Sequence, residues 1–221
     1  MPESSVPGLP GSPDSRGRRD RSRRSKGTLP DAESPPRRMS GDANPESHQQ
    51  ITVRRLRADE WQAFRDLRLA ALRTDPLAFG STLSRESTYS DQKWRNLCND
   101  GATGTSNVTF VAADPSGELV GMVGTFSAEG TSHVWGMWTR PHRRNQGIGH
   151  RLMNSLLDWI ATCLPEVSII LDVNPSQEAA VRIYASAGFH FNGVEEPLGH
   201  DPPAVVRQMV RRPGRALSET A

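Results

Sequence analysis

The sequence has few cysteines and no long apolar run. Cys98 and Cys163 are the two cysteines among 221 residues, which predicts no disulfide framework. We expect Cys163 to be a small hydrophobic residue that is buried or half-buried late in a helix. No apolar stretch is long enough to span a bilayer, and the N-terminus lacks the apolar core of a signal peptide. These absences predict a soluble, cytoplasmic protein with no membrane partner.

Several motifs that would carry chemistry are also missing. The histidines show no His-Glu-x-x-His spacing and the cysteines no paired spacing, so no metal is expected. There is no Walker loop and no Gly-x-Ser-x-Gly nucleophile elbow. A dinucleotide fingerprint would need Gly or Ala at position 152, where Leu152 stands. The net charge of +2 is small, so overall charge predicts no nucleic-acid partner.

Residues 1–50 differ in composition from the rest of the chain. They are rich in Pro, Ser, Gly and Arg and poor in large apolar groups, which predicts a disordered extension. Seven basic residues lie between Arg16 and Lys26, against one acidic residue, Asp20. This run could contact nucleic acid or simply be solvated. No aromatic residue is interleaved for base stacking, which favours the solvated extension.

The remaining pattern predicts one folded domain over residues 51–212, followed by a flexible tail over residues 213–221. Strands are expected at residues 51–56, 108–113, 118–126, 134–139, 167–173, 189–194 and 204–210. Helix caps are expected at Asp59, at Ser90 or Asp91 and at Ser176, and a further helix is expected to begin at Ile148. Gly121 and Gly124 indicate a close backbone approach within a strand. The order predicts an α/β fold, with a mixed (α+β) sheet that has helices on both sides.

The stretch from Val134 to Leu152 reads as a strand, a glycine-bearing turn and an amphipathic helix. The first turn of a helix carries backbone N–H groups without partners and a partial positive charge. Gly147 and Gly149 would let a phosphate approach the backbone, while Arg143 and Arg144 add positive charge. The stretch therefore predicts a pyrophosphate site. An ordinary glycine turn before a helix is an equal alternative on this stretch alone.

Two signatures in the correct order give the chain a family resemblance. The first is Arg144-x-x-Gly147-x-Gly149. The second runs from Leu171-Asp172-Val173-Asn174 through Ala180-x-x-Ile183-Tyr184-x-x-x-Gly188-Phe189. With both, residues 51–212 resemble the GNAT superfamily of N-acetyltransferases. The phrase Asp75-Pro76-Leu77-Ala78-Phe79-Gly80-Ser81-Thr82 is similar to a bacterial branch of that superfamily.

The resemblance implies an acetyltransferase that uses acetyl-CoA and no metal. An amine acceptor, either a small molecule or a protein amine, would attack the thioester directly in a ternary complex. Strand 134–139 would splay from its parallel neighbour 167–173 and hold pantetheine between them. The coenzyme-binding residues implied are Met137, Trp138, Thr139, Arg143, Arg144, Asn145, Gln146, Gly147, Ile148, Gly149, His150, Asn174, Gln177 and Tyr184.

The resemblance also makes Tyr184 the general acid. A phenol with a pKa near ~10 can protonate the departing CoA thiolate without being ionised itself. The structural alternative is a tyrosine at the core edge whose hydroxyl reaches a backbone group. Four residues are candidates for the general base, and the sequence selects none of them: Glu86, Glu129, His133 and Asp172.

Two other functions stay open at this point. A non-catalytic acyl-CoA sensor would have the same fold. A protein associated with nucleic acid would act through the Arg-rich extension, although one charge run is weaker support than two motifs. The identity of the acceptor amine and the oligomeric state, a homodimer included, are also open.

Overall fold

The structure, a computed structural model, describes residues 50–128 and 130–213. The predictions for the N-terminal extension, except at residue 50, lie outside the described residues. The same is true of residues 214–221 of the predicted tail and of Glu129, one of the candidate bases. None of the described helices has both the length and the hydropathy needed to cross a membrane.

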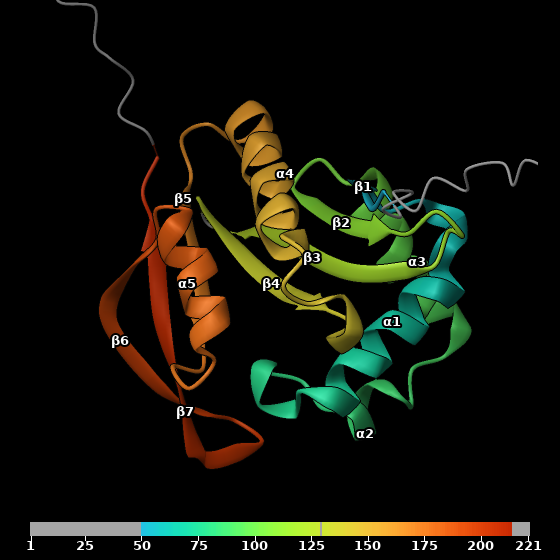
Figure 1. Ribbon diagram of the computed structural model, residues 1–221. Coiled ribbons are helices and arrows are strands. Elements are labelled where there is room, and N and C mark those ends of the chain that lie inside the picture. The colour runs from blue at the N-terminus through green and yellow to red at the C-terminus, as the bar shows by residue number, and fades with distance from the viewer. Residues whose placement is uncertain (1–49, 129, 214–221) are drawn as a thin grey trace, which may run out of the picture. The chain divides into compact units, whose positions relative to one another are not determined.

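Seven strands and five α-helices follow one another along the described chain (Figure 1). The strands are β1 (Thr52–Arg55), β2 (Asn107–Ala113), β3 (Leu119–Ala128), β4 (Thr131–Thr139), β5 (Ser168–Val173), β6 (His190–Leu198) and β7 (Asp201–Arg211). The α-helices are α1 (Trp61–Thr74), α2 (Leu83–Glu86), α3 (Asp91–Thr103), α4 (Ile148–Cys163) and α5 (Glu178–Ser186).

The strands form one mixed sheet in the order β1-β2-β3-β4-β5-β7-β6. Every neighbouring pair is antiparallel except β4 and β5, which run parallel. Helix α4 lies across β2, β3 and β4, with α5 beside it (Figure 1). Helices α1 and α3 cover the opposite face of β2, β3 and β4. The parallel pair requires a crossover, and α4 provides it.

Side chains of β3 belong to both of the two clusters that form the core, and the register of β3 with β2 shifts at Val120. Val120 and Val123 pack with Leu152 of α4 in the first cluster, which also includes Tyr184 and Phe189. Leu119 and Met122 belong to the second cluster, which contains the apolar face of α1 and the buried side of α3. Each fully buried aliphatic side chain contributes about 1.5–3 kcal/mol of hydrophobic stabilisation. Both faces of β3 are therefore anchored.

The predicted order of strands and helices is confirmed, and the differences are local. Asp59 is not the cap of α1, because a 3-10 turn over Ala58–Glu60 precedes the helix and places Glu60 at the cap position. Ser90 caps α3 by accepting a hydrogen bond from the Lys93 backbone N–H. Helix α5 begins after Gln177 rather than at Ser176, and the short helix α2 was not predicted.

The two cysteines lie in different environments. Cys98 is fully buried, and its thiol donates to the Arg57 carbonyl. Burial, with the nearby carboxylates of Glu60 and Asp59, raises the pKa of this thiol to about 11. Cys163 is exposed at the end of α4, so the prediction that it is at least half-buried was wrong.

The two glycines of β3 do mark close contacts, as predicted. A Cβ atom on Gly121 would lie 3.1 Å from Leu152 of α4. A Cβ atom on Gly124 would lie 2.5 Å from the indole ring of Trp135, which belongs to the neighbouring strand β4. The bare backbone at Gly124 therefore allows the Trp135 ring to lie against the sheet.

Replacing Gly124 with alanine should lower the free energy of unfolding by about 1–3 kcal/mol. The rigid ring of Trp135 leaves no room for the added methyl group. Urea unfolding followed by circular dichroism measures the change. The control is Gly199→Ala, where a Cβ meets no described atom within 4 Å. The control should stay within about 0.5 kcal/mol of wild type. Equal stabilities for Gly124→Ala and wild type would contradict the packing described.

Candidate active site

The parallel strands β4 and β5 separate after three residue pairs. Their paired Cα positions end at His133 and Ile170. Farther along β4, a bulge interrupts the pairing with β3, and Gly136 in this bulge has a φ of 71°. A cavity of about 30 Å³ lies between the diverging strands. Backbone groups on this edge of β4 need hydrogen-bond partners, which an extended ligand could supply.

The loop that leads into α4 has the geometry of an anion site. Asn145 has a φ of 61°, making it the single non-glycine residue with positive φ in the described part of the chain. Gly147, the cap residue of α4, has a φ of 71°, and no side chain caps the helix. The first-turn N–H groups therefore have no acceptor among the described residues and face outward with the positive end of the helix dipole. Such an end binds phosphate groups well.

The two glycines of this loop are required for different reasons. A Cβ on Gly147 would meet no described atom within 4 Å, so its left-handed φ is what favours glycine there. A Cβ on Gly149 would lie 2.8 Å from Cδ1 of Ile183 and 3.4 Å from Cε of Met137. Gly149 therefore lets α4 pack closely on α5, which the sequence interpretation did not foresee.

Both predicted arginines form ion pairs. The Arg143 guanidinium contacts Asp114 in the turn between β2 and β3, at 3.1 Å. Arg144 contacts Asp75 at 2.5 Å, and its Nε donates to the Thr139 carbonyl at 3.2 Å. The side chain of Arg144 is 43% exposed and that of Arg143 is 20% exposed. Arg144 is thus the more accessible of the two to an incoming anion.

The other predicted residues of β4 and the loop divide into buried and exposed groups. Trp138 is buried, and its indole Nε1 donates to Asp75 Oδ2 at 2.6 Å. Ile148 lies in the core, so only its backbone faces the loop. Met137 is half-buried and lines the gap between β4 and β5. Asn145, Gln146 and His150 are exposed.

Tyr184 is buried in α5 with its ring edge-on to Phe189, at 6.2 Å between centroids. It lines the gap between β4 and β5 together with Gly136 and Met137. Its hydroxyl makes no hydrogen bond with any residue in the described ranges, so the alternative of a backbone-bonded tyrosine is wrong. Burial raises the pKa of this hydroxyl well above its usual range, so the phenol is neutral at pH 7.

The two predicted amide residues before α5 differ in position. Gln177 lines the gap, and its side chain does not cap the helix. Asn174 is buried, and its Oδ1 accepts hydrogen bonds from the backbone N–H and the hydroxyl of Ser176. Asn174 therefore shapes the turn that leads into α5, while Gln177 faces the gap.

The three described base candidates lie in different surroundings. Asp172 is exposed and lines the gap between β4 and β5. His133 stacks on the Phe126 ring, at 4.9 Å between centroids. Glu86 is buried, and both its oxygens accept hydrogen bonds from Arg68, at 3.0 and 2.8 Å. Of these three candidates, Asp172 lines the gap between β4 and β5, and His133 and Glu86 do not.

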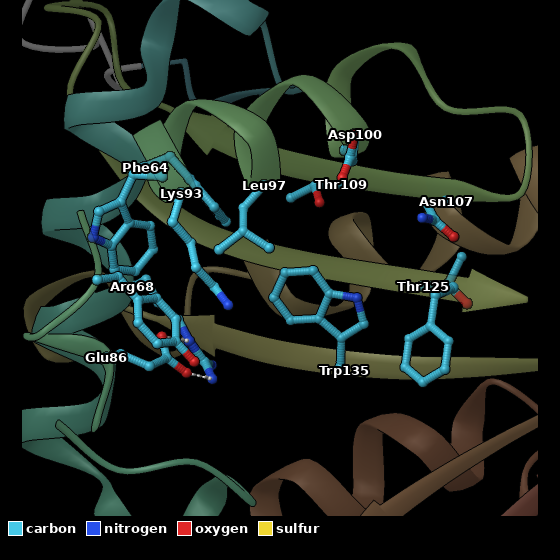
Figure 2. A pocket seen from close by; sticks show the side chains of 14 residues that line it. Phe64, Arg68, Glu86, Lys93, Leu97, Asp100, Asn107, Thr109, Thr125 and Trp135 are labelled. Atoms are coloured by element: carbon cyan, nitrogen blue, oxygen red, sulfur yellow. Dashed lines mark hydrogen bonds and ion pairs between the residues drawn. The ribbon is translucent and has the colours of Figure 1, made fainter. Parts of the chain in front are cut away.

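A second cavity, of about 350 Å³, lies on the face of the sheet covered by α1 and α3 (Figure 2). Trp135 lines both this cavity and the gap between β4 and β5. Arg68 and Glu86 lie at one end of it, where the Arg68 guanidinium packs on Phe79, 4.8 Å from the ring centroid. No described group of His, Cys, Asp and Glu side chains is arranged to hold a metal ion.

Apart from Glu86, which was a candidate base, the sequence interpretation assigned none of the residues of this second cavity to a site. One signal was available: Arg68 lies on the same helical face as the apolar residues Phe64, Leu67 and Ala71, a stripe that normally excludes charge. Lys93 and Trp135 gave no comparable signal, because their positions depend on how α3 packs over β3 and β4.

Comparison with known proteins gives one family match. The model of the acetyltransferase (GNAT) family matches residues 59–189, which is more than half of the chain. No curated protein sequence matches the chain.

Solved structures with a similar fold include an acetyltransferase of the GNAT family from Streptococcus pneumoniae. Its TM-score is 0.63 at 19% identity, covering 75% of this chain and 100% of that one. The spermidine N-acetyltransferase from Vibrio cholerae, in complex with CoA and spermine, has a TM-score of 0.60 at 21% identity, covering 74% and 96%. A phosphinothricin acetyltransferase from Sinorhizobium meliloti, in complex with AcCoA, has a TM-score of 0.61 at 16% identity, covering 76% and 90%. At these identities the likeness shows the fold.

The buried hydroxyl of Tyr184 should make the stability of the protein depend on alkaline pH. Because its pKa is higher in the folded than in the unfolded chain, its extra stability is complete below the unfolded value of about 10. That stability is lost as the pH rises above about 10, because the unfolded chain then releases a proton that the folded chain retains.

Urea unfolding of the wild type and of Tyr184→Phe, across about pH 8 to 11, measures this dependence. The difference in unfolding free energy between them should be constant up to about pH 9.5 and should then shift against the wild type. The comparison cancels the alkaline effect of Cys98, which both proteins retain. A difference that stays constant to about pH 11 would show that Tyr184 ionises equally in both states.

Proposed function

The chain belongs to the acetyltransferase (GNAT) family, and we propose that it transfers the acetyl group of acetyl-CoA to a primary amine by direct attack in a ternary complex. The observation that carries this proposal is the gap between β4 and β5. The N-terminus of α4, which no described side chain caps, follows β4 in the chain. Tyr184, whose hydroxyl has no hydrogen-bond partner among the described residues, lines the gap.

The donor would lie along the free edge of β4. Its diphosphate would accept hydrogen bonds from the first-turn N–H groups of α4, with Arg144 turning toward it from Asp75. The pantetheine arm would run between β4 and β5, where the backbone of β4 beyond His133 pairs with no described strand on that side. Met137 and Gln177 line this gap and would contact the arm.

The chemistry follows from the residues that line the gap. A neutral amine nitrogen forms a bond to the thioester carbon while the C–S bond breaks, which leaves a CoA thiolate and an amide. Negative charge builds on the thioester oxygen, and a backbone N–H at the Gly136 bulge would stabilise it. The neutral hydroxyl of Tyr184 would donate a proton to the thiolate. Asp172 or water would take the proton that the amine loses.

The acceptor would approach from the face of the sheet that carries the larger cavity. Trp135 lines both that cavity and the gap, so an amine held over its ring lies next to the donor site. Two of the three similar structures named above come from enzymes whose names give the substrates spermidine and phosphinothricin. Their names support an amine acceptor in this chain.

Acetyl-CoA should bind to the wild-type protein in isothermal titration calorimetry, and Gly147→Trp should abolish the binding. An indole at position 147 would fill the space in front of the first turn of α4, where the diphosphate would lie. Gly193→Trp is the matched control, because Gly193 also has a positive φ and an open Cβ position but lies in β6. Equal affinities for acetyl-CoA in both variants would contradict the placement of the donor.

Tyr184→Phe should reduce kcat about 100-fold while leaving the affinity for acetyl-CoA within about threefold of wild type. The variant keeps the buried ring and removes only the proton donor. Steady-state kinetics with a panel of amines and chromatographic detection of the acetylated product measure the effect. An unchanged kcat would exclude Tyr184 as the general acid. Binding without acetylation of any amine would favour the sensor function instead.

A further inference from the structure

We propose that the acceptor is a small amine that also carries a carboxylate, of the class of α-amino acids with an apolar side chain. It would bind in the cavity of about 350 Å³ between α1, α3 and the sheet, with its carboxylate at Lys93. This inference rests on the proposed acetyl transfer and names the substrate class of the same site.

The size and walls of the cavity indicate a compact, largely apolar ligand. Its volume is at the lower end of the range for small-molecule sites. The wall of the cavity is more apolar than polar, and six apolar or aromatic residues contribute to it: Phe64, Tyr89, Trp94, Leu97, Phe126 and Trp135. Leu97 is 40% exposed and Phe126 is 43% exposed, and a ligand side chain that reached them would cover both. An apolar group the size of a leucine or phenylalanine side chain suits such walls.

The charged residues of the cavity wall distinguish among classes of amine acceptor. Arg68 and Glu86 form a buried pair in which Nε and Nη2 of the arginine each donate to one carboxylate oxygen. Their charges offset each other, which leaves Lys93 and Asp100 as the other charged residues of the cavity wall. Figure 2 shows Lys93 at the end of the cavity near Arg68 and Asp100 away from it.

Lys93 is the cation available to a ligand. Its ammonium lies 4.4 Å above the Tyr89 ring and makes no ion pair or hydrogen bond with any residue in the described ranges. Figure 2 shows the ammonium group directed into the space between Arg68 and Trp135. A carboxylate at this place would give Lys93 the charged partner that it lacks here.

A second unpartnered donor lies at the same end. Nη1 of Arg68 is buried and has no hydrogen-bond partner among the described residues. It lies 3.9 Å from the position that a Cβ on Gly136 would take, which places it beside the bulge of β4. A buried donor without a partner is costly to the folded state, so an acceptor atom brought by a ligand would be favoured there. Both donors favour an anionic ligand group.

At the end of the cavity near Arg68, the same arrangement disfavours a polyamine. Both oxygens of Glu86 already accept hydrogen bonds from Arg68, so this carboxylate is not a free counter-ion for an ammonium group. The free Lys93 would repel a polycation at the end next to the donor site. An amine next to a carboxylate, as in an α-amino acid, would lie within a few bonds of the anion that Lys93 holds.

The test compares amines that differ only in the carboxylate. The first pair is phenylalanine and phenethylamine, and the second is leucine and isoamylamine. The acetylated products are separated by chromatography, because the exposed Cys163 would react with the reagents used to detect free CoA. For wild type we expect kcat/KM to be at least tenfold higher for each amino acid than for its decarboxylated analogue.

The key variant is Lys93→Gln, which removes the charge from an exposed residue without disturbing the core. The ratio of kcat/KM values between phenylalanine and phenethylamine should fall about tenfold, mainly through a higher KM for phenylalanine. Arg95→Gln is the matched control, because Arg95 lies on the same helix but packs on Trp61, outside the cavity. The control should keep the wild-type ratio. A wild-type preference for the decarboxylated amines, or a ratio unchanged by Lys93→Gln, would overturn the proposal.

A binding measurement separates this proposal from the proposed function. Trp94 and Trp135 line the cavity, so phenylalanine should change the tryptophan fluorescence of wild type but not that of Lys93→Gln. If no amine is acetylated but phenylalanine binds through Lys93, the proposed function fails and the ligand class holds. If amines are acetylated without any preference for a carboxylate, the proposed function holds and the ligand class fails.

Discussion

The early separation of β4 from β5 is the constraint on which the candidate site depends. Parallel strands that stayed paired along their length would bury the backbone edge that now faces the gap. The pairing ends at His133, and the Gly136 bulge then increases the local twist of β4. Strand β5 keeps its register with β7 on its other side, so the sheet stays continuous around the opening.

Two close contacts, at Gly149 and at Gly124, position the residues around the gap between β4 and β5. Gly149 allows the first turn of α4 to meet Ile183 of α5, one residue before Tyr184. This contact couples the position of the loop before α4 to the position of the tyrosine hydroxyl. On the other face, Gly124 allows the Trp135 ring to lie on β3, where it forms a wall of the larger cavity. Both contacts depend on the absence of one methyl group.

The sequence predicts the parts of this arrangement that are set by short segments. The strand, glycine loop and helix from Val134 to Cys163 follow from apolar periodicity and glycine positions, and the structure has them. Gly188, which follows α5 by two residues, has a φ of 86°, the left-handed conformation in which glycine commonly ends a helix. Placement of Tyr184 in the gap agrees with the family signature, although its role remains a prediction.

The features that the sequence did not predict depend on contacts between distant segments, or on short helices and turns that leave no clear sequence pattern. Glycine is required at position 149 because the Ile183 side chain of α5 lies against it. The Arg68–Glu86 ion pair joins α1 to α2, which are separated by a loop. Helix α2 spans Leu83–Glu86, too short for helical periodicity to show. The predicted cap at Asp59 was wrong because a 3-10 turn that contains Asp59 precedes α1 in the chain.

The carboxylate of Asp75 joins parts of the chain that a domain-grafting experiment would treat as separate. It ends α1, accepts from Trp138 in β4 and pairs with Arg144 in the loop before α4. These partners lie 63 and 69 residues away in the sequence. An exchange of the 75–82 segment that replaced Asp75 would therefore also remove the ion-pair partner of Arg144 in the loop before α4. A chimera that keeps this loop intact needs Asp75, Trp138 and Arg144 from the same parent.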